Sequence, residues 1–303
     1  MMGEIFSAGK LLLTSEYVVL DGALALAVPT RLGQVLFYDT LPSEAPVIKW
    51  KAYHQEKLWL EAEIDPKTWS IIRSNNLEAA KFICKVLRGV DHFSKGIFKD
   101  SQTYYFKTIL EFPSDFGLGS SSTLMNCLGK WANIDPFLLN EYSLGGSGYD
   151  IAVAKENNAL LYQINGGERE WKSVSFNPDF HRELILIHLG KKQNSRDGIL
   201  HYREQTVKKE WISEFSRLTM DVLNAKDLSE FEALMSLHEV RISEIIGLPT
   251  IKEQLFSDAP VFIKSLGAWG GDFILSRRFP SYNAYFSERG FSTIFDYSEL
   301  VHL

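Results

Sequence analysis

The chain has 303 residues, with 32 lysines and arginines against 38 aspartates and glutamates, which gives a formal net charge of −6 at pH 7. This balance argues against a nucleic-acid partner or an anionic membrane surface, because binding to either requires clustered basic side chains. Hydrophobic residues make up 45% of the chain and charged residues 23%, as in an ordinary globular protein, and the length suits about two domains.

Periodicity predicts the elements in chain order. Apolar alternation predicts strands over residues 3–13, 23–38, 47–63 (two strands), 104–112 and 184–188. Helical spacing occurs over residues 70–88, 123–132, 206–224 and 228–246. A hairpin is expected around Asn165-Gly166-Gly167, and strand pairs are expected in the last thirty residues. One sheet-and-helix half followed by another predicts an α+β chain of two domains, with a boundary near residues 176–183.

Two cysteines, Cys84 and Cys127, are far apart in separate helical patterns. A disulfide framework or metal cluster would need more partners at shorter spacing, so we expect two buried free thiols. The N-terminus lacks the pattern of a signal peptide, and no apolar run reaches the ~20 residues of a membrane span. These features predict a cytoplasmic protein with no membrane partner.

The loop over residues 113–122, PSDFGLGSSS, carries the most information. Gly117 and Gly119 can take positive φ, whereas Ser120, Ser121 and Ser122 supply hydroxyls and an N-cap. The first-turn amides of the following helix would then face an anion, and a polyphosphate suits such a loop. A simple capped turn is the alternative. The missing third glycine argues against a dinucleotide fingerprint, and the absence of GxxxxGK[ST] excludes a P-loop.

Three segments together resemble the motifs of the GHMP kinase superfamily, in the family's order. Pro113 to Ser121 match the second motif, P-x-x-x-G-L-G-S-S. Residues 8–22, AGKLLLTSEYVVLDG, resemble the first motif, in which a glutamate follows the lysine of P-G-K after six residues, here Lys10 and Glu16. Residues 264–272, KSLGAWGGD, resemble the third motif, K-x-S-G-A-G-G-G-D.

A fourth segment and several departures refine this resemblance. Residues 146–152, GSGYDIA, resemble the G-S-G-x-D-x-A of the mevalonate and phosphomevalonate kinase branch, and also a GHMP group named for its GYDIA string. Ser7 and Ser15 replace a proline and a glycine of the first motif, which are small-for-small changes. Trp269 interrupts the third glycine run, where its ring could stack on a base or close part of a pocket. Asp115 adds a negative charge to the phosphate loop.

The resemblance implies a two-domain GHMP kinase fold. An ATP-binding domain with a βαβ-type phosphate site would cover residues 1–178, a ferredoxin-like domain would cover residues 179–303, and the active site would lie in the cleft between them. The implied reaction transfers the γ-phosphoryl group of ATP, with Mg²⁺, to an alcohol or phosphate of a small-molecule acceptor. Mevalonate or 5-phosphomevalonate, substrates of isoprenoid biosynthesis, are the preferred acceptors. Phe116 before the glycines and the GGD ending of the third motif favour the phosphomevalonate type.

Other functions fit the same motifs. A sugar or amino-acid alcohol kinase of the same fold is the enzymatic alternative, and a mevalonate-diphosphate-type decarboxylase shares the fold. A catalytically silent ligand-binding homologue would explain Trp269 and Asp115, although such a protein need not keep Lys10, Ser121 and Asp150. The sequence is compatible with a homodimer.

The resemblance also assigns roles to residues. Asp150 would accept the hydroxyl proton, with the alternative that it only caps the helix over residues 151–156, and Lys10 would hold this carboxylate ionised beside the γ-phosphate. Ser121 and Glu141 would be ligands of Mg²⁺, a cation that prefers oxygen. The nucleotide would contact Pro113, Gly117, Leu118, Gly119, Ser120, Ser121, Ser122 and Glu16.

The acceptor side is assigned in the same way. Its residues would be Gly148, Tyr149, Ser195, Arg196, Gly267, Ala268, Gly270, Gly271 and Asp272. Arg196 could hold an acceptor carboxylate or phosphate with two hydrogen bonds. Ser195 and Arg196 are equally explained as ordinary polar residues of a loop. Asp272 is a candidate for orienting the third glycine loop.

Overall fold

The computed structural model describes residues 2–190, 199, 200, 202–205 and 207–303. The chain forms two compact units that interleave along the sequence. Unit 1 consists of Met1–Gly9, Leu32–Ser114 and Gly119–Asn157. Unit 2 consists of Lys10–Arg31, Asp115–Leu118 and Asn158–Leu303. The glycine-serine loop over residues 113–122 thus contributes residues to both units.

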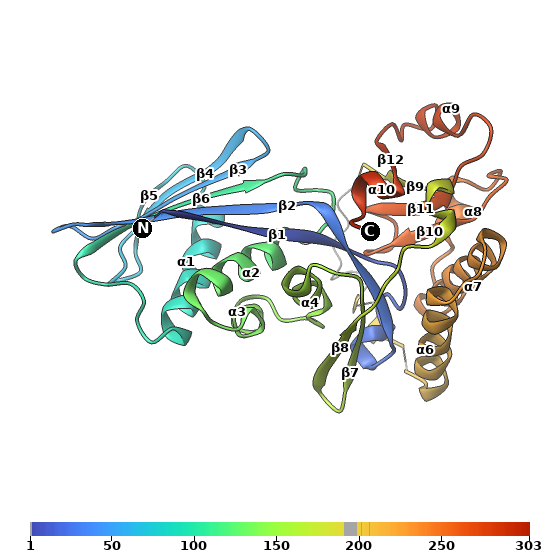
Figure 1. The fold of residues 1–303 in the computed structure, drawn as a ribbon, viewed down its shortest axis with the longest axis horizontal. Coiled ribbons are helices and arrows are strands. Elements are labelled where there is room, and N and C mark those ends of the chain that lie inside the picture. The colour runs from blue at the N-terminus through green and yellow to red at the C-terminus, as the bar shows by residue number, and fades with distance from the viewer. Residues whose placement is uncertain (1, 191–198, 201, 206) are drawn as a thin grey trace. The chain divides into compact units, whose positions relative to one another are not determined.

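Unit 1 is a mostly antiparallel sheet covered by helices. Its strands run in the order β5 (Ile71–Ser74), β4 (Lys57–Ile64), β3 (Ile48–His54), β6 (Gln102–Leu110) and the second half of β2 (Ala25–Pro42), and β1 (Gly3–Leu12) also pairs with β2. The β3–β6 pair is parallel. Figure 1 shows the helices α1 (Leu77–Phe93), α2 (Ser120–Ala132), α3 (Pro136–Ser143) and α4 (Tyr149–Glu156) on the same side of this sheet.

Alternation along the strands decides which face the helices cover. On β6, Tyr104, Phe106 and Thr108 are buried, whereas Tyr105 and Lys107 between them are exposed. The ring of Phe106 packs edge-on against Trp131 of α2, with centroids 4.8 Å apart. The predicted strands of this unit are therefore confirmed, and their apolar face forms its core.

The helix predicted over residues 70–88 begins later than expected. Ile71–Ser74 forms β5, which pairs with β4, because β-branched residues suit a strand that packs on one face. The helix α1 starts at Leu77, where the Asn76 side chain accepts a hydrogen bond from the Ala79 amide at 3.2 Å. Asn76 is thus an N-cap that separates the two elements.

Unit 2 contains a four-stranded antiparallel sheet. Its order is β10 (Ile263–Leu266), β11 (Phe273–Arg277), β9 (Leu184–His188) and β12 (Ile294–Asp296). The helices α6 (Lys209–Leu223), α7 (Leu228–Ile246) and α8 (Ile251–Leu255) lie between β9 and β10 in the chain, and α9 (Tyr282–Ser287) lies between β11 and β12. This βαββαβ order is ferredoxin-like, as the resemblance implied.

Shorter elements complete unit 2. The hairpin of β7 (Leu160–Asn165) and β8 (Glu168–Ser173) turns at Gly166 and Gly167, both at positive φ, as predicted. The strand β7 pairs with the start of β2 at Ala25–Ala27. The chain also forms 3-10 turns at Val18–Asp21 (η1) and Asp179–Glu183 (η2), and a last helix, α10 (Tyr297–Leu300).

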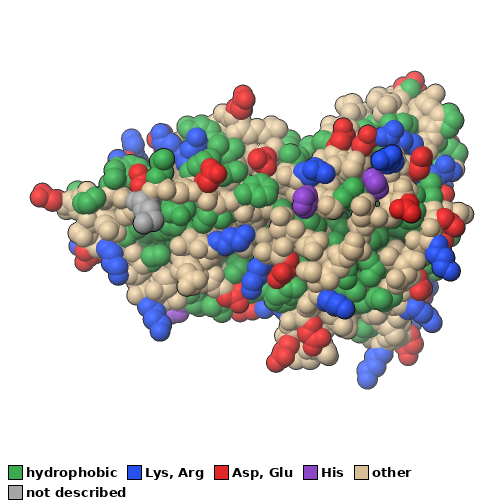
Figure 2. Space-filling model, in the orientation of Figure 1, with side chains coloured by type: hydrophobic (Ala, Val, Ile, Leu, Met, Phe, Trp, Pro, Cys, Tyr) green, Lys and Arg blue, Asp and Glu red, His purple; other side chains and the backbone are tan. Residues whose placement is uncertain are grey.

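Burial and charge agree with the composition. Cys84 and Cys127 are both free and buried, as predicted. Figure 2 shows basic and acidic side chains interspersed over the displayed face, without a basic patch. Among the helices that the structure describes, none is both long enough and apolar enough to cross a membrane.

Candidate functional site

The helix α2 begins with an N-terminus suited to an anion. Its N-cap is Gly119, at φ 86°, and among the described residues no side chain caps this end. The expectation of a serine N-cap is therefore wrong, because the sharp turn into the helix requires a left-handed residue, and glycine takes that conformation easily. The Ser122 hydroxyl instead donates to the Gly119 carbonyl at 2.7 Å. Ser120 and Ser121 are half-exposed in the first turn, beside amides that can bind an anion.

The four residues Asp115–Leu118 belong to unit 2, where Lys10 holds them. The Lys10 Nζ donates to the Gly117 carbonyl at 2.8 Å, and its backbone amide donates to Leu118 at 3.0 Å. Gly117 has φ 68°, and a Cβ there would lie 2.2 Å from Cγ of Asp272. Glycine is therefore required at residue 117 both by its backbone conformation and by the carboxylate packed against it.

The third glycine run forms a loop between β10 and β11. Gly267 and Gly270 have φ of 79° and 81°, and Asp272 also lies in the left-handed region, at 54°. The Gly271 amide donates to Ala268 at 3.2 Å, and the Leu189 amide donates to the Asp272 carbonyl at 2.9 Å. Because the Asp272 carboxylate reaches Gly117, unit 2 brings together residues from all three sequence motifs.

Trp269 belongs to the core of unit 2. Its side chain is only 4% exposed, its Nε1 donates to the Pro249 carbonyl at 3.2 Å, and its amide donates to the Tyr17 hydroxyl at 2.8 Å. The expectation that this ring could stack on a base is therefore wrong. The Trp269 ring anchors the loop between β10 and β11, which we call the third loop. The backbone amide of Trp269 connects this loop to Tyr17 of the first motif.

Glu16 of the first motif lies in a buried ionic cluster with Lys264 and Glu239. The Lys264 Nζ donates to Glu16 Oε1 at 2.6 Å and lies 3.6 Å from Glu239 Oε2. Burial raises the pKa of Glu16 to about 7 although Lys264 opposes this rise, and burial raises the pKa of Glu239 as well. His238 Nε2 accepts the Ser15 amide at 2.7 Å, so this ring is neutral, and burial lowers its pKa.

Lys264 and Glu239 were not predicted as functional residues. Lys264 was quoted within the third motif, and Glu239 lies in a helix whose pattern indicated only amphipathic packing. The available signal was the apolar surroundings of each residue, in the segments VFIKSL and SLHEV. A charged residue in such surroundings needs a buried partner, although the sequence does not say which one.

Other predicted residues of unit 1 lie on its helices or just before them. Gly148, at φ 87°, precedes α4, and half-buried Asp150 is in the first turn of that helix, where Oδ1 accepts from the Ile151 amide at 3.0 Å. Exposed Glu141 is on α3, and α2 packs against both α3 and α4. Ser195 and Arg196 lie outside the described residues.

The donor set for a magnesium ion is sparse. Within the described ranges, no group of three or more His, Cys, Asp or Glu side chains is placed to hold one metal ion. Mg²⁺ in kinases commonly takes one or two protein ligands and draws the rest from phosphates and water. Ser121 and Glu141 carry oxygen atoms, the donor type that such an ion prefers.

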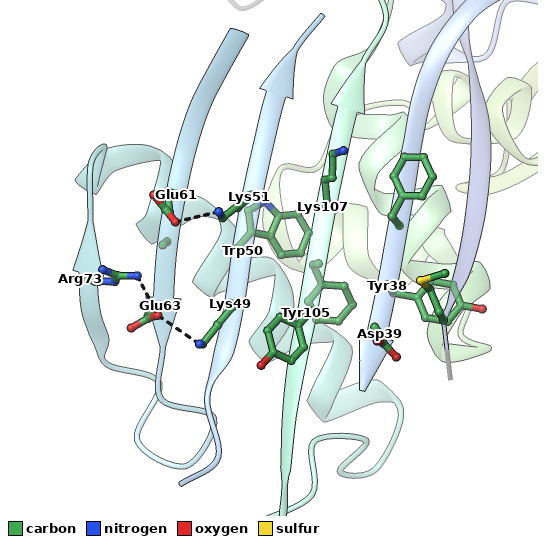
Figure 3. Close-up of a pocket in the computed structure, with 14 residues that line it drawn as sticks. Tyr38, Asp39, Lys49, Trp50, Lys51, Glu61, Glu63, Arg73, Tyr105 and Lys107 are labelled. Atoms are coloured by element: carbon green, nitrogen blue, oxygen red, sulfur yellow. Dashed lines mark hydrogen bonds and ion pairs between the residues drawn. The ribbon is translucent and has the colours of Figure 1, made fainter. Parts of the chain in front are cut away.

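A separate cavity of about 410 Å³ lies on the face of the unit 1 sheet that its helices do not cover (Figure 3). Five of the seven charged side chains that line it form ion pairs between neighbouring strands: Lys51 with Glu61 at 3.3 Å, and Glu63 with both Lys49 at 3.9 Å and Arg73 at 3.1 Å. None of the motif residues lines this cavity. Its pattern is that of a solvent-facing sheet surface.

Comparison with known proteins identifies the fold. No protein-family model matches the sequence, and no curated protein matches it. Mevalonate kinase of Methanococcus jannaschii aligns with a TM-score of 0.70 at 14% identity, over 97% of each chain. Phosphomevalonate kinase of Streptococcus pneumoniae, solved with phosphomevalonate and AMPPNP, aligns with a TM-score of 0.68 at 15% identity, over 95% of this chain and 97% of its own.

A sugar kinase has the same architecture. Galactokinase of Lactococcus lactis, solved with galactose, aligns with a TM-score of 0.65 at 12% identity, over 95% of this chain and 88% of its own. These proteins share an α+β architecture with this chain along almost its whole length. The chain therefore has the fold of the GHMP kinases.

Proposed function

We propose that the protein is an ATP- and Mg²⁺-dependent small-molecule kinase whose acceptor is mevalonate or 5-phosphomevalonate. The observation that carries this proposal is the meeting of the three motif segments in unit 2. Lys10 binds the Gly117 carbonyl at 2.8 Å, and the Asp272 carboxylate packs against the same glycine. A loop of this kind before an uncapped helix N-terminus is suited to phosphate groups.

The roles of the residues follow from the negative charge of the ATP phosphates, which the site must neutralise. The amides of the first turn of α2 would bind phosphate oxygens, and the Lys10 ammonium would balance their negative charge. Ser121 and Glu141 would hold Mg²⁺, which would neutralise charge on the phosphates. Asp272 would fix the approach of the third loop to Gly117.

Asp150 would accept a proton if the acceptor is an alcohol. The hydroxyl oxygen would then form a bond to the γ-phosphorus, the bond from this phosphorus to the bridging oxygen of ADP would break, and the hydroxyl proton would pass to Asp150. A phosphate acceptor is already largely deprotonated at neutral pH, since its second pKa is about 6. The two acceptors therefore differ in their need for Asp150.

Turnover of a panel of acceptors tests this proposal. Release of ADP from Mg-ATP is measured with mevalonate, 5-phosphomevalonate, sugars and hydroxy amino acids, for the wild type and for Asp150→Asn. Turnover with mevalonate that is lost in the variant supports an alcohol kinase, whereas turnover with 5-phosphomevalonate that survives supports a phosphate acceptor. Turnover confined to a sugar would favour the sugar-kinase alternative.

A catalytically silent homologue remains the alternative from another class. Trp269 was one of the two residues that suggested this alternative. Its side chain is buried in the core, so it no longer supports a silent homologue. Binding of Mg-ATP without turnover of any acceptor would favour the silent homologue over the kinase.

A further inference from the structure

Unit 2 contains a buried cation with two buried carboxyls. Lys264 on β10 has a fully buried side chain, and the side chains of Glu16 and Glu239 are each only 3% exposed. Lys264 Nζ lies 2.6 Å from Glu16 Oε1 and 3.6 Å from Glu239 Oε2. The Lys264 ammonium also donates to the Ser265 carbonyl. We call Glu16, Lys264 and Glu239 the buried clasp.

The charge of the buried clasp does not balance when both carboxyls are ionised. One lysine compensates one carboxylate, and a second carboxylate without a counter-ion is costly in an apolar interior. His238 cannot supply the missing cation, because its Nε2 accepts the Ser15 amide at 2.7 Å. Glu16 Oε2 has no hydrogen-bond partner among the residues that the structure describes, and its 3.7 Å separation from His238 Nε2 is too long for one.

The buried clasp therefore holds a proton near neutral pH. Its charged and titratable neighbours come from each element packed around it: Lys264 from β10, Glu239 and His238 from α7, and Tyr17 next to Glu16. Burial raises the pKa of Glu16 to about 7 and also raises the pKa of Glu239. Burial likewise raises the pKa of Tyr17, so this hydroxyl stays neutral. Ionisation of the second carboxyl thus falls near neutral pH.

The same three residues connect the first and third motifs. Glu16 lies between Ser15 and Tyr17, both at φ 65°, a strained conformation that neighbouring contacts must maintain. The Tyr17 hydroxyl accepts the amide of Trp269 in the third loop at 2.8 Å.

On the other side of the buried clasp, Glu239 accepts the Ser265 amide at 3.0 Å and the Ile251 amide at 3.3 Å. Ser265 is two residues before Gly267, where the third loop begins. The clasp therefore joins the Glu16 segment, α7, α8 and the start of the third loop.

We propose that the buried clasp is a positioning device that fixes the first-motif segment against the third glycine loop, so that release of its proton loosens this loop and weakens nucleotide binding. Glu16, Lys264 and Glu239 would then be positioning residues, because their side chains are buried in the clasp. Glu16 would act on the nucleotide through the loop, in place of the direct contact that the resemblance implied. The inference rests on the proposed kinase function for its nucleotide, while the loop itself can be observed without any ligand.

Hydrogen exchange measures the loop directly. Exchange of the peptide that covers residues 263–273 is compared at each pH between wild type and Glu16→Gln, which keeps an acceptor for Lys264 but cannot titrate. Comparison at equal pH cancels the intrinsic dependence of exchange on pH. We expect the wild-type peptide to exchange on the order of 10-fold faster than the variant above pH 7 and equally fast below it, in keeping with typical coupling free energies.

Binding of Mg-AMPPNP measures the consequence. The wild-type dissociation constant is expected to rise on the order of 10-fold from about pH 6 to about pH 9, and that of Glu16→Gln to stay within about 2-fold. Glu239→Gln should flatten the profile in the same way, since one carboxylate then matches one lysine. Glu214→Gln is the matched control: Glu214 pairs with Arg241 at 2.7 Å in the same unit, outside the buried clasp, and this variant should follow the wild type.

The outcomes separate the two proposals. If the wild type fails to bind Mg-AMPPNP at every pH, the proposed kinase function fails, and the exchange of residues 263–273 still decides whether the buried clasp controls the loop. If wild type, Glu16→Gln and Glu239→Gln show the same pH profile both for exchange and for binding, the buried clasp is not a positioning device. If the control Glu214→Gln has the same pH profile as Glu16→Gln and Glu239→Gln, the buried clasp is likewise not a positioning device.

Discussion

Replacing Glu16 by glutamine should stabilise the protein at alkaline pH. In the structure Glu16 Oε1 accepts from Lys264 at 2.6 Å. Glutamine preserves the shape of the side chain and this acceptor, and it mimics the protonated carboxyl. Wild type and variant should therefore have nearly equal free energies of unfolding at low pH. They should diverge as the pH rises above 4.5, where the unfolded carboxyl ionises while the folded one keeps its proton.

The size of this divergence follows from the pKa. Burial raises the pKa of Glu16 from 4.5 to about 7, so between these values the folded chain keeps a proton that the unfolded chain has released. Raising the pH through this interval therefore favours the unfolded chain. One pKa unit corresponds to about 1.4 kcal/mol, so the wild type should lose ~3 kcal/mol of unfolding free energy that Glu16→Gln retains.

The pKa shift of His238 changes the unfolding free energy with pH in the opposite direction, and the comparison of wild type with Glu16→Gln removes this contribution. The pKa of His238 is lowered below 6.5, so the stability it contributes is present above pH 6.5 and is lost as the pH falls. This term is present in both wild type and variant. The difference between their unfolding free energies therefore reports Glu16 together with its coupling to Glu239.

Urea unfolding followed by circular dichroism provides the measurement, from about pH 5 to about pH 9. Glu214→Gln is again the control, because its hydrogen bond to Arg241 lowers the pKa of Glu214 and keeps it ionised throughout this range. Its difference from the wild type should not change with pH. A constant difference for Glu16→Gln as well, or one in which the variant becomes less stable as the pH rises, would refute the assignment of a proton to the buried clasp.

Three further substitutions test the candidate site. Gly117→Ala should cost roughly 2–3 kcal/mol of stability in urea unfolding and reduce turnover, because residue 117 has a positive φ and its Cβ would clash with the Asp272 carboxylate. Gly166→Ala is the control: residue 166 also has a positive φ, but a Cβ there would have nothing within 4 Å, so it should cost only about 1 kcal/mol. Equal losses in the two variants would contradict the clash with Asp272. Ser121→Ala should raise the Mg²⁺ concentration needed for half-maximal turnover; a change confined to melting temperature would make this serine purely structural. Asp150→Asn should lower turnover of an alcohol acceptor by on the order of 100-fold or more with nearly unchanged Mg-AMPPNP affinity, and near-normal turnover would remove Asp150 from the mechanism.

Much of the fold was accessible from local pattern. Residues 184–188 are apolar without interruption, and they form the central strand β9. The glycines at 166 and 167 marked the hairpin turn because few other residues adopt positive φ twice in succession. The helix over residues 70–88 was predicted to begin too early, since periodicity alone does not distinguish a short strand followed by an N-cap from the first turn of a helix.

The candidate site was accessible only in part. The resemblance placed Lys10, Gly117 and Asp272 in motifs, and the structure brings these three together within unit 2. The pairing of Glu16 with Lys264 could not be predicted, because the two residues are 248 positions apart and the requirement for a buried counter-ion does not name its partner. The same holds for the burial of Trp269, which depends on tertiary packing and not on its glycine-rich neighbours.

The measurement that tests the central claim most directly is acceptor-dependent release of ADP from Mg-ATP, with wild type and Asp150→Asn compared on mevalonate and 5-phosphomevalonate. The account predicts turnover with one of these acceptors, and loss of that turnover in the variant when the acceptor is the alcohol. Mg-ATP binding without release of ADP on any acceptor, in wild-type protein that is folded, would contradict the assignment of a kinase.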